Sequence, residues 1–274
     1  MKKRGRGIAA MFYPIGGTAT PVPAAIFVKV NTDGTAVAFT GASDIGQGSI
    51  TIIGQIIAEE LDVELGQVDM VLGDTAMAPN QGPTIASASI QITAVPLRQA
   101  AAQARAFLLA RAADALGAAA AELVVERGVI SHGERRIAYA DLVRGERLHL
   151  MLDPEVALKP VQQYRVVGQS APRVDIPAKV RGEFVFVHDK RLPGMLHGRV
   201  VRPPYAGADH GDFIGNTLES VDESSIAHIP GVRAVVVIRD FVGVVAEREE
   251  QAEAAALALK VVWRAWPGFA PLDD

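Results

Sequence analysis

The stretch Asp44–Leu61 constrains the fold of this chain most strongly. It holds a tight glycine loop, Gly46-Gln47-Gly48, followed at once by a run of helix-forming residues. Two glycines around one amide residue let the backbone come close to a ligand without side-chain clash. The helix that follows directs its unpaired N–H groups, and the positive end of its dipole, at the loop. The stretch therefore predicts either an anion site, with phosphate as the usual ligand, or a plain loop-to-helix turn.

The helix after this loop is predicted to be amphipathic. Its apolar residues recur at helical spacing and indicate one buried face, formed by Ile52, Ile53, Ile56, Ile57 and Leu61. We expect Glu59 and Glu60 to point toward solvent or toward a partner. The hydroxyl of Ser49 or Thr51 is expected to cap the start of the helix.

A β-hairpin is predicted before the loop, and a second helix after it. Two β-rich runs, 26–30 and 37–40, flank an Asp-Gly turn, and a further strand is expected over 68–72. A loop of small residues then leads into a helix expected from about Val95 to Leu116, with Pro96 suited to its first turn. The end of that loop, Thr84–Ser89, is a second candidate anion cradle.

The remainder of the chain predicts an α+β protein with two domains. The proline-containing stretch 145–164 indicates a linker running over a surface, so we expect a first domain over 1–150, a linker over 151–166 and a second domain over 167–274. Strands mixed with short helices favour an α+β class for the second half. The expected elements are a hairpin over 123–131, a helix over 137–143, extended segments over 164–168 and 172–180, strands over 183–187, 195–201, 233–238, 241–246 and 260–263, and helices over 222–228 and 249–259.

Composition excludes several classes of function. The 27 basic and 31 acidic residues form no basic block, which argues against nucleic-acid binding. The absence of cysteine excludes disulfides, a thiol nucleophile and an iron–sulfur cluster held by this chain. The basic start, Met1–Arg6, is followed by an apolar run too short and broken for an export signal, and no run reaches membrane-spanning length. The predicted location is therefore the cytoplasm.

An ordered set of motifs resembles the xanthine dehydrogenase and aldehyde oxidase superfamily of molybdenum hydroxylases. The first half resembles part of its second molybdenum domain, through Arg4-Gly5-Arg6-Gly7, Gly46-Gln47-Gly48, Ala58-Glu59-Glu60-Leu61 and Ser87-Ala88-Ser89. The second half resembles the α/β-hammerhead domain, through Pro172-Arg173-Val174-Asp175, Leu192-Pro193-Gly194 and Val201-Arg202-Pro203-Pro204. The glycine-loop half comes first, an order similar to that of the isoquinoline 1-oxidoreductase β-subunit and nicotinate dehydrogenase branch. The chain would match the front portion of such a subunit.

The resemblance implies a cofactor and a set of residues that bind it. The cofactor is molybdenum-molybdopterin, expected in its cytosine dinucleotide form and shared with a partner subunit. A [2Fe-2S] centre, and in some complexes FAD, would lie on other subunits. Gln47 would hydrogen-bond the pterin or an oxo ligand, or alternatively brace its own loop. The implied cofactor-binding residues are Gly46, Gln47, Gly48, Thr51, Thr84, Ser87 and Ser89.

No catalytic or metal-ligating residue is predicted in this chain. The family's catalytic glutamate lies in a glycine-rich segment far along the full subunit, and the sequence is expected to end before it; Glu59 and Glu60 lie in a different context. The histidines lack metal-ligand spacing, and no nucleophile elbow is present. The chain is thus expected to be one subunit of a complex that hydroxylates an N-heteroaromatic compound, or oxidises an aldehyde, with water as the oxygen source. Its partners would be a large molybdopterin-binding catalytic subunit, an iron–sulfur subunit and, in some complexes, an FAD subunit.

Two alternatives remain open at this point. One is a non-catalytic assembly or binding subunit that keeps the fold without the cofactor. The other is an unrelated nucleotide-binding α/β enzyme, for which the glycine loop would hold a free nucleotide.

Overall fold

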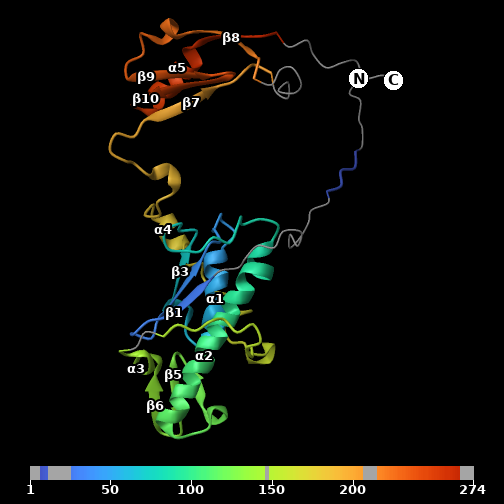
Figure 1. The fold of residues 1–274 in the computed structure, drawn as a ribbon, viewed down its shortest axis with the longest axis vertical. Coiled ribbons are helices and arrows are strands. Elements are labelled where there is room, and N and C mark those ends of the chain that lie inside the picture. The colour runs from blue at the N-terminus through green and yellow to red at the C-terminus, as the bar shows by residue number, and fades with distance from the viewer. Residues whose placement is uncertain (1–6, 12–25, 146–147, 206–214, 266–274) are drawn as a thin grey trace. The chain divides into compact units, whose positions relative to one another are not determined.

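A computed structural model describes residues 7–11, 26–145, 148–205 and 215–265 of the chain (Figure 1). The chain divides into two compact units, 1–184 and 185–274, which are described separately. Both contain helices and sheets, which confirms the α+β class. The basic start, 1–6, lies outside the described residues, as does His210.

The first unit is built on a three-stranded sheet with a β-α-β crossover. Its strands are β1 (Phe27–Val30), β2 (Ala36–Thr40) and β3 (Val68–Leu72), in the order β1-β2-β3. The first two form the predicted antiparallel hairpin, and β2 pairs with β3 in parallel. Helix α1 (Ser49–Leu61) and the 3₁₀ turn η1 (Leu65–Gln67) connect the parallel pair. The glycine loop therefore lies between a strand and the helix of a crossover, where the carboxyl ends of parallel strands meet loops.

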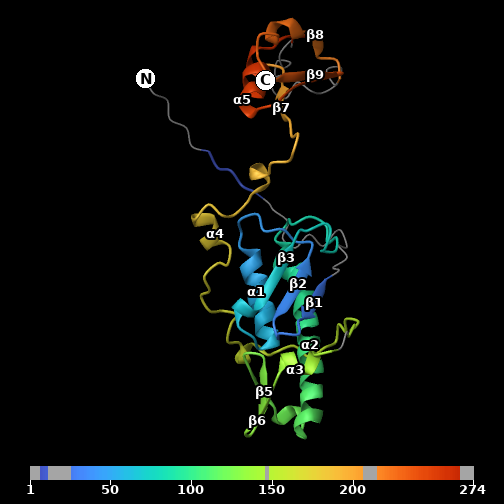
Figure 2. The same cartoon turned by 90° about the vertical axis from the view of Figure 1, so that its left-hand side faces the viewer.

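A long helix and a small antiparallel sheet complete the body of this unit. Helix α2 is preceded by a π-helical turn, η2, and lies beside α1 (Figure 2). Its apolar residues share one core with α1 and the sheet. The hairpin predicted over 123–131 is confirmed. The helix predicted over 137–143 begins only at Tyr139, because Arg135–Ala138 pairs with the preceding strand. The elements are η2 (Ser89–Thr93), α2 (Ala94–Leu116), η3 (Ala120–Glu122), β4 (Val124–Glu126), β5 (Val129–His132), β6 (Arg135–Ala138) and α3 (Tyr139–Val143).

Helix α1 is buried on a polar face as well as on an apolar one. Ile53, Ile57 and Leu61 are in the core as predicted, whereas Ile52 is 43% exposed. The prediction that Glu59 and Glu60 point toward solvent or a partner is wrong, since both are at most 2% exposed within this chain. The two carboxylates are covered by a later segment of the chain.

That segment, residues 148–184, is called the strap. It contains η4 (Val161–Gln163) and α4 (Ile176–Val180), the latter in a stretch predicted to be extended. Side-chain amides of α2 bond its backbone: Gln99 donates to the Pro154 carbonyl at 2.8 Å and Gln103 to that of Met151 at 2.7 Å. The strap then runs along α1 (Figure 2) and belongs to the first unit. The stretch predicted as a linker is thus fixed on this surface, and the domain types assigned to 1–150 and 167–274 stay predictions.

The acidic end of α1 fixes the strap by ion pairs and backbone bonds. Glu59 Oε2 accepts the consecutive backbone N–H groups of residues 165, 166 and 167, at 2.8, 2.6 and 2.9 Å. Its other oxygen lies 3.0 Å from Lys159 Nζ, which also lies 2.6 Å from Asp62. Glu60 accepts the Lys159 N–H at 3.0 Å and Arg98 Nε at 2.6 Å. Both glutamates are therefore fully engaged within the chain.

The second unit is antiparallel. It has a sheet of order β7-β10-β9 and a separate pair, β11-β8, around a core that includes Val242, Val244 and Ala255. The strand predicted over 183–187 is wrong: no strand forms there, and a 3₁₀ turn begins at Val187. The sequence does not predict strand β8, and the hammerhead arrangement stays a prediction. The elements are η5 (Val187–Asp189), β7 (His197–Val201), β8 (Leu218–Asp222), η7 (Glu223–Ile226), β9 (Val232–Ile238), β10 (Phe241–Ala246), α5 (Glu249–Ala258) and β11 (Lys260–Trp263). Within the described ranges, none of the helices has both the length and the apolar character needed to cross a membrane.

Candidate functional site

The candidate site lies at the carboxyl ends of the parallel strands β2 and β3. Residues 41–48 follow β2, and residues 73–88 follow β3 and lead into η2 and α2. Loops at this edge of a parallel sheet are the usual place for ligands in α/β folds. Both loops singled out from the sequence therefore start from the same edge.

The two glycines of the first loop have different surroundings. Both have left-handed backbone conformations, with φ of 107° at Gly46 and 87° at Gly48. A Cβ atom built on Gly46 would meet nothing within 4 Å. On Gly48 it would lie 3.5 Å from the guanidinium of Arg173. The loop is thus open at Gly46 and covered by the strap at Gly48.

The N–H groups at the start of α1 already have an anionic acceptor, the carboxylate of Asp44. It accepts from the amides of Gly46 at 2.9 Å, Gly48 at 3.4 Å and Ile50 at 3.0 Å. Burial opposes ionisation of Asp44, but these bonds outweigh it and lower the pKa of its carboxyl below the ordinary 3.8. The acceptor expected to be a bound phosphate is therefore supplied by the chain itself.

Asp44 also replaces the predicted cap of the helix. Neither Ser49 nor Thr51 caps α1, so that prediction is wrong. Thr51 is 3% exposed, and its hydroxyl accepts the N–H of Val174 in the strap at 3.0 Å. Thr51 therefore fixes the strap onto α1.

The side chain of Gln47 braces its own loop. Its oxygen accepts the Ile45 N–H at 2.6 Å, and its Nε2 donates to the Ser43 carbonyl at 2.9 Å and the Ser49 hydroxyl at 3.1 Å. This is the bracing arrangement considered as the alternative role for the residue. The amide would have to exchange at least one of these partners to hydrogen-bond a ligand.

Two side-chain contacts join the loop after β2 to the loop after β3. The Thr84 hydroxyl accepts the Ser43 N–H at 2.8 Å. Gln81 Oε1 accepts the Gly41 N–H at 2.7 Å and the Thr40 hydroxyl. Gln81 Nε2 is buried and has no hydrogen-bond partner among the described residues. The edge thus contains a donor that lacks an acceptor, which is a common mark of a functional or hydrated site.

The second loop combines backbone strain with available hydroxyls. Ala86 and Ser87 both have positive φ, 51° and 56°, a conformation that costs roughly 1–3 kcal/mol for each non-glycine residue. Among the described residues, the hydroxyls of Ser87 and Ser89 have no hydrogen-bond partner. Strain of this kind persists where the surrounding structure imposes it, most often at ligand sites.

A charged cluster on the strap borders the first loop. Arg173 donates to the Gly46 carbonyl at 2.7 Å and forms a two-point pair with Asp175, at 3.0 and 2.7 Å. Lys179, four residues further along, also pairs with Asp175. Hydrogen bonds from Arg173 first, and then from Lys179, hold the pKa of the Asp175 carboxyl far below its ordinary value.

The structure brings together most of the predicted residues and adds three others. Gly46, Gln47 and Gly48 join the second loop through Ser43 and Thr84. Sequence reasoning missed Asp44, Gln81 and Arg173. An aspartate two residues before the glycine loop was a local signal that it accepts loop amides. For Arg173 the sequence contains no local signal, since 127 residues separate it from its partner Gly46.

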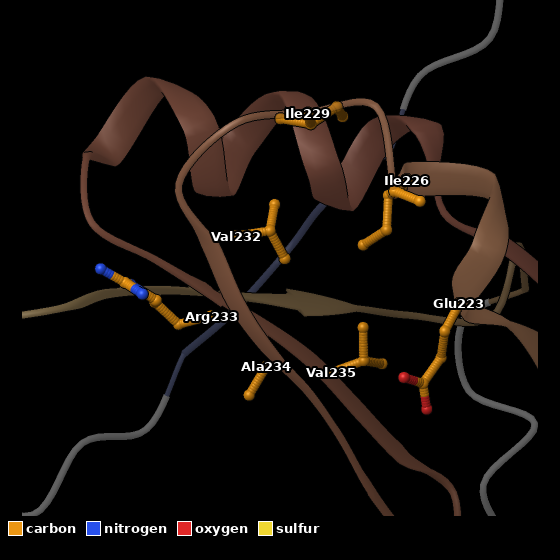
Figure 3. A pocket seen from close by; sticks show the side chains of 8 residues that line it. Glu223, Ile226, Ile229, Val232, Arg233, Ala234 and Val235 are labelled. Carbon is orange, nitrogen blue, oxygen red and sulfur yellow. The ribbon is translucent and has the colours of Figure 1, made fainter.

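Two other cavities are less suited to a cofactor. One, of about 290 Å³, lies beside the strap and is lined mainly by apolar residues, among them Ile56, Ile90 and Val95. The other, of about 220 Å³, lies in the second unit, where Glu223 and Arg233 are its charged lining residues (Figure 3). Both fall below the ~300 Å³ at which small-molecule pockets usually begin. Among the described residues, no group of three or more His, Asp or Glu could hold a metal ion.

Comparisons with known proteins give a family and three relatives. Residues 1–180 match the family described as molybdopterin cofactor-binding domain. A nicotinate dehydrogenase subunit from Pseudomonas putida is 58% identical over 248 residues, which are 90% of this chain and 21% of that protein. The β-subunit of isoquinoline 1-oxidoreductase from Brevundimonas diminuta is 28% identical, over 91% of this chain and 36% of that protein. "Membrane-bound aldehyde dehydrogenase [pyrroloquinoline-quinone]" of Gluconacetobacter polyoxogenes is 30% identical, over 87% of this chain and 31% of that protein. The chain thus spans between about one fifth and about one third of the length of these relatives.

Proposed function

Since this chain belongs to the molybdopterin cofactor-binding domain family of the molybdenum hydroxylases, we propose that it is a cofactor-holding subunit of a multi-subunit molybdenum hydroxylase. The observation that carries the proposal is the pair of loops at the carboxyl ends of β2 and β3, joined by the Ser43–Thr84 bond. One loop has an open glycine, Gly46, and the other has two available serine hydroxyls. Small residues and hydroxyls on adjacent loops suit a flat, polar heterocycle with phosphates attached.

The two loops would bind different parts of the cofactor. Asp44 occupies the amides at the start of α1, and its charge would repel a phosphate placed there. We therefore assign the pterin to the first loop, where Gly46 leaves room beside the backbone. The phosphates go to the second loop, where Ser87 lies just before the π-helical turn η2 and Ser89 begins it, ahead of the long helix α2. A cytosine dinucleotide form of the cofactor would extend along this second loop.

Proton transfer is assigned to a partner chain. Both buried glutamates of α1 already accept hydrogen bonds from the strap, three of them from backbone N–H groups to Glu59, so neither is free to act as a base. When bound, the molybdenum centre supplies a two-electron oxidation in which water provides the oxygen atom. This chain would hold and orient the cofactor, while a large subunit supplies the catalytic base. Iron–sulfur and, in some complexes, FAD subunits would carry the electrons away.

The substrate class follows from the relatives alone. Two of the three are named for N-heteroaromatic compounds, nicotinate and isoquinoline, and the third for aldehydes. We propose hydroxylation of an N-heteroaromatic compound, with aldehyde oxidation as the alternative. The third name also gives a quinone cofactor, so the metal content of the purified complex is a direct test.

The test is to produce the chain together with its genomic neighbours and measure bound molybdenum and pterin. We expect about one molybdenum per complex containing this chain. Replacing both loop serines, Ser87→Ala with Ser89→Ala, should lower cofactor content several-fold without lowering thermal stability, because neither hydroxyl is bonded within the described chain. Ser170→Ala is the matched control, an exposed serine on the strap. Unchanged cofactor content in the double variant would contradict the assigned site.

One observation favours a second candidate function. Because Asp44 accepts the backbone N–H groups at the start of α1, these groups need no bound ligand, as expected for a non-catalytic assembly subunit. That function predicts a stable complex free of molybdenum, whose partner's activity is indifferent to the Ser87 and Ser89 substitutions. Tight binding of a free nucleotide to the isolated chain, measured by calorimetry, would instead support the nucleotide-binding alternative.

A further inference from the structure

We propose that Arg173 is a positioning residue for the Gly46–Gly48 loop, holding it in place from the strap. This inference deepens the proposed function, because it concerns the loop assigned to the pterin. It rests on the bonds that reach the loop, on how Arg173 itself is fixed, and on the charges around it.

The first argument is that the loop has few bonds to the rest of the protein. Asp44 and Gln47 bond it internally, within residues 43–50. Gly46 adds no packing, since a Cβ atom there would meet nothing within 4 Å. Among the described residues, the bond from Arg173 Nη1 to the Gly46 carbonyl links the open part of the loop to a distant segment. The guanidinium also covers Gly48.

The second argument is that Arg173 is held rigidly. Asp175 is buried and accepts from both Nε and Nη2, so the plane of the guanidinium is fixed by two parallel bonds. The residue next to Arg173, Val174, is bonded to Thr51 at the first turn of α1. Further along α1, Gln55 donates to the Val166 carbonyl at 3.2 Å and Glu59 accepts three strap amides. Helix α1, which starts at the loop, therefore holds the strap in place, and the strap in turn bonds the loop through Arg173.

The third argument is electrostatic. Asp44 places a negative charge at the start of α1, and Arg173 Nη2 lies 3.9 Å from one of its oxygens. Asp175 and Lys179 add one charge of each sign, so the four groups sum to zero. The cluster therefore adds no net charge beside the loop, so the pterin assigned to this loop would meet no net repulsion from it, while the phosphates lie at the second loop, away from Asp44. Lysine could not replace Arg173, because it lacks the planar fork that bonds Asp175 and Gly46 together.

The decisive measurement is amide hydrogen exchange on the full chain without cofactor. Arg173→Ala should speed exchange at the amides of Gly46, Gly48 and Ile50 by about tenfold or more, the loss expected for a charge-assisted bond. Arg173→Lys should fail to restore protection. The strap amides 165–167, bonded to Glu59, should keep their wild-type rates and report that the variants are folded. Arg181→Ala is the matched control, since Arg181 forms an exposed two-point pair with Glu183 on the same strap.

The outcomes separate this inference from the proposed function. Unchanged exchange at 46–50 in Arg173→Ala, or full rescue by Arg173→Lys, would overturn the positioning role. Faster exchange together with a several-fold loss of molybdenum in the co-produced complex supports it. If the wild-type complex contains no molybdenum, the proposed function fails, while the exchange experiment still decides how the loop is held.

Discussion

The bonds of Glu59 to the strap amides 165–167 and to Lys159, together called the clamp, give the most specific prediction for stability. Glu59→Gln keeps the shape of the side chain and removes its charge. Three amide bonds change from charge-assisted to neutral, a loss of about 1 kcal/mol each. The ion pair with buried Lys159 is also lost, although Asp62 remains 2.6 Å from the same ammonium and limits the damage. We expect the first unit to lose about 3–4 kcal/mol, within the ~3–5 kcal/mol range for removing one partner of a buried ion pair.

The two units provide an internal control for this measurement. Trp263 lies in β11 of the second unit, whereas α1 and α2 belong to the first. In urea, the circular dichroism transition of Glu59→Gln should move to lower denaturant by roughly 1 M, while the tryptophan fluorescence transition stays in place. Glu183→Gln, which breaks an exposed pair, should leave both transitions in place.

The pH dependence has a definite sign. Burial opposes ionisation of Glu59, but bonds from the strap amides and Lys159 outweigh it and hold its pKa below the ordinary 4.5. Its contribution is therefore complete above about pH 4.5 and is lost as the pH falls through the lowered folded-state pKa. The stability difference between wild type and Glu59→Gln should shrink over that interval. If the free energies of unfolding of wild type and Glu59→Gln differ by less than about 1 kcal/mol at pH 7, or if the difference grows on acidification, the stabilising role of the Glu59 bonds is refuted.

Three further substitutions test other parts of the structure. Tyr139→Phe removes a buried hydroxyl that donates to the Leu61 carbonyl at 2.8 Å, and should cost about 1–2 kcal/mol by circular dichroism; a neutral result would show that this carbonyl finds another donor. Asp44→Ala should destabilise the same transition by about 1 kcal/mol through loss of its capping bonds; this effect is complete above about pH 3.8 and is lost as the pH falls from there through the lowered folded-state pKa. Gly231→Ala should destabilise the second unit by about 1 kcal/mol in tryptophan fluorescence, since φ is 78° and this left-handed conformation is strained for alanine. Wild-type fluorescence transitions in that variant would contradict this backbone strain.

Elements governed by local chemistry could be predicted from the sequence. The hairpin of β1 and β2 follows from an Asp-Gly turn between β-rich runs, and the long helix α2 from alanine-rich composition ending at Gly117. The last two residues of β6, Ile137 and Ala138, were predicted to be helical, because Arg135–Ala138 becomes a strand only by pairing with β5. The run 183–187 has strand composition, but no strand among the described residues pairs with it. Composition alone does not provide the partner that a strand requires.

The candidate site shows the same division between local and distant information. The glycine loop and the start of the second helix were found from sequence, since both depend on short patterns. The roles of Glu59 and Arg173 were not, because their partners lie more than 100 residues away along the chain. A buried carboxylate on a helix resembles a solvated one in sequence until the segment that covers it is known. The role of Asp44 could have been predicted, because an acidic side chain directly before a turn of small residues commonly accepts hydrogen bonds from the turn amides.

The polar clamp on α1 also has a consequence for protein synthesis. Lys159 follows Glu59 by 100 residues, so at about 5–20 residues per second the ribosome adds it roughly 5–20 s later. Throughout that delay the helix face that will receive the strap stands uncovered. An apolar face would invite aggregation during this time, whereas Glu59, Glu60 and Asp62 keep it hydrated and repel other nascent chains of the same kind. The surface of α1 that waits for the strap is therefore polar, and it does not favour aggregation while it is uncovered.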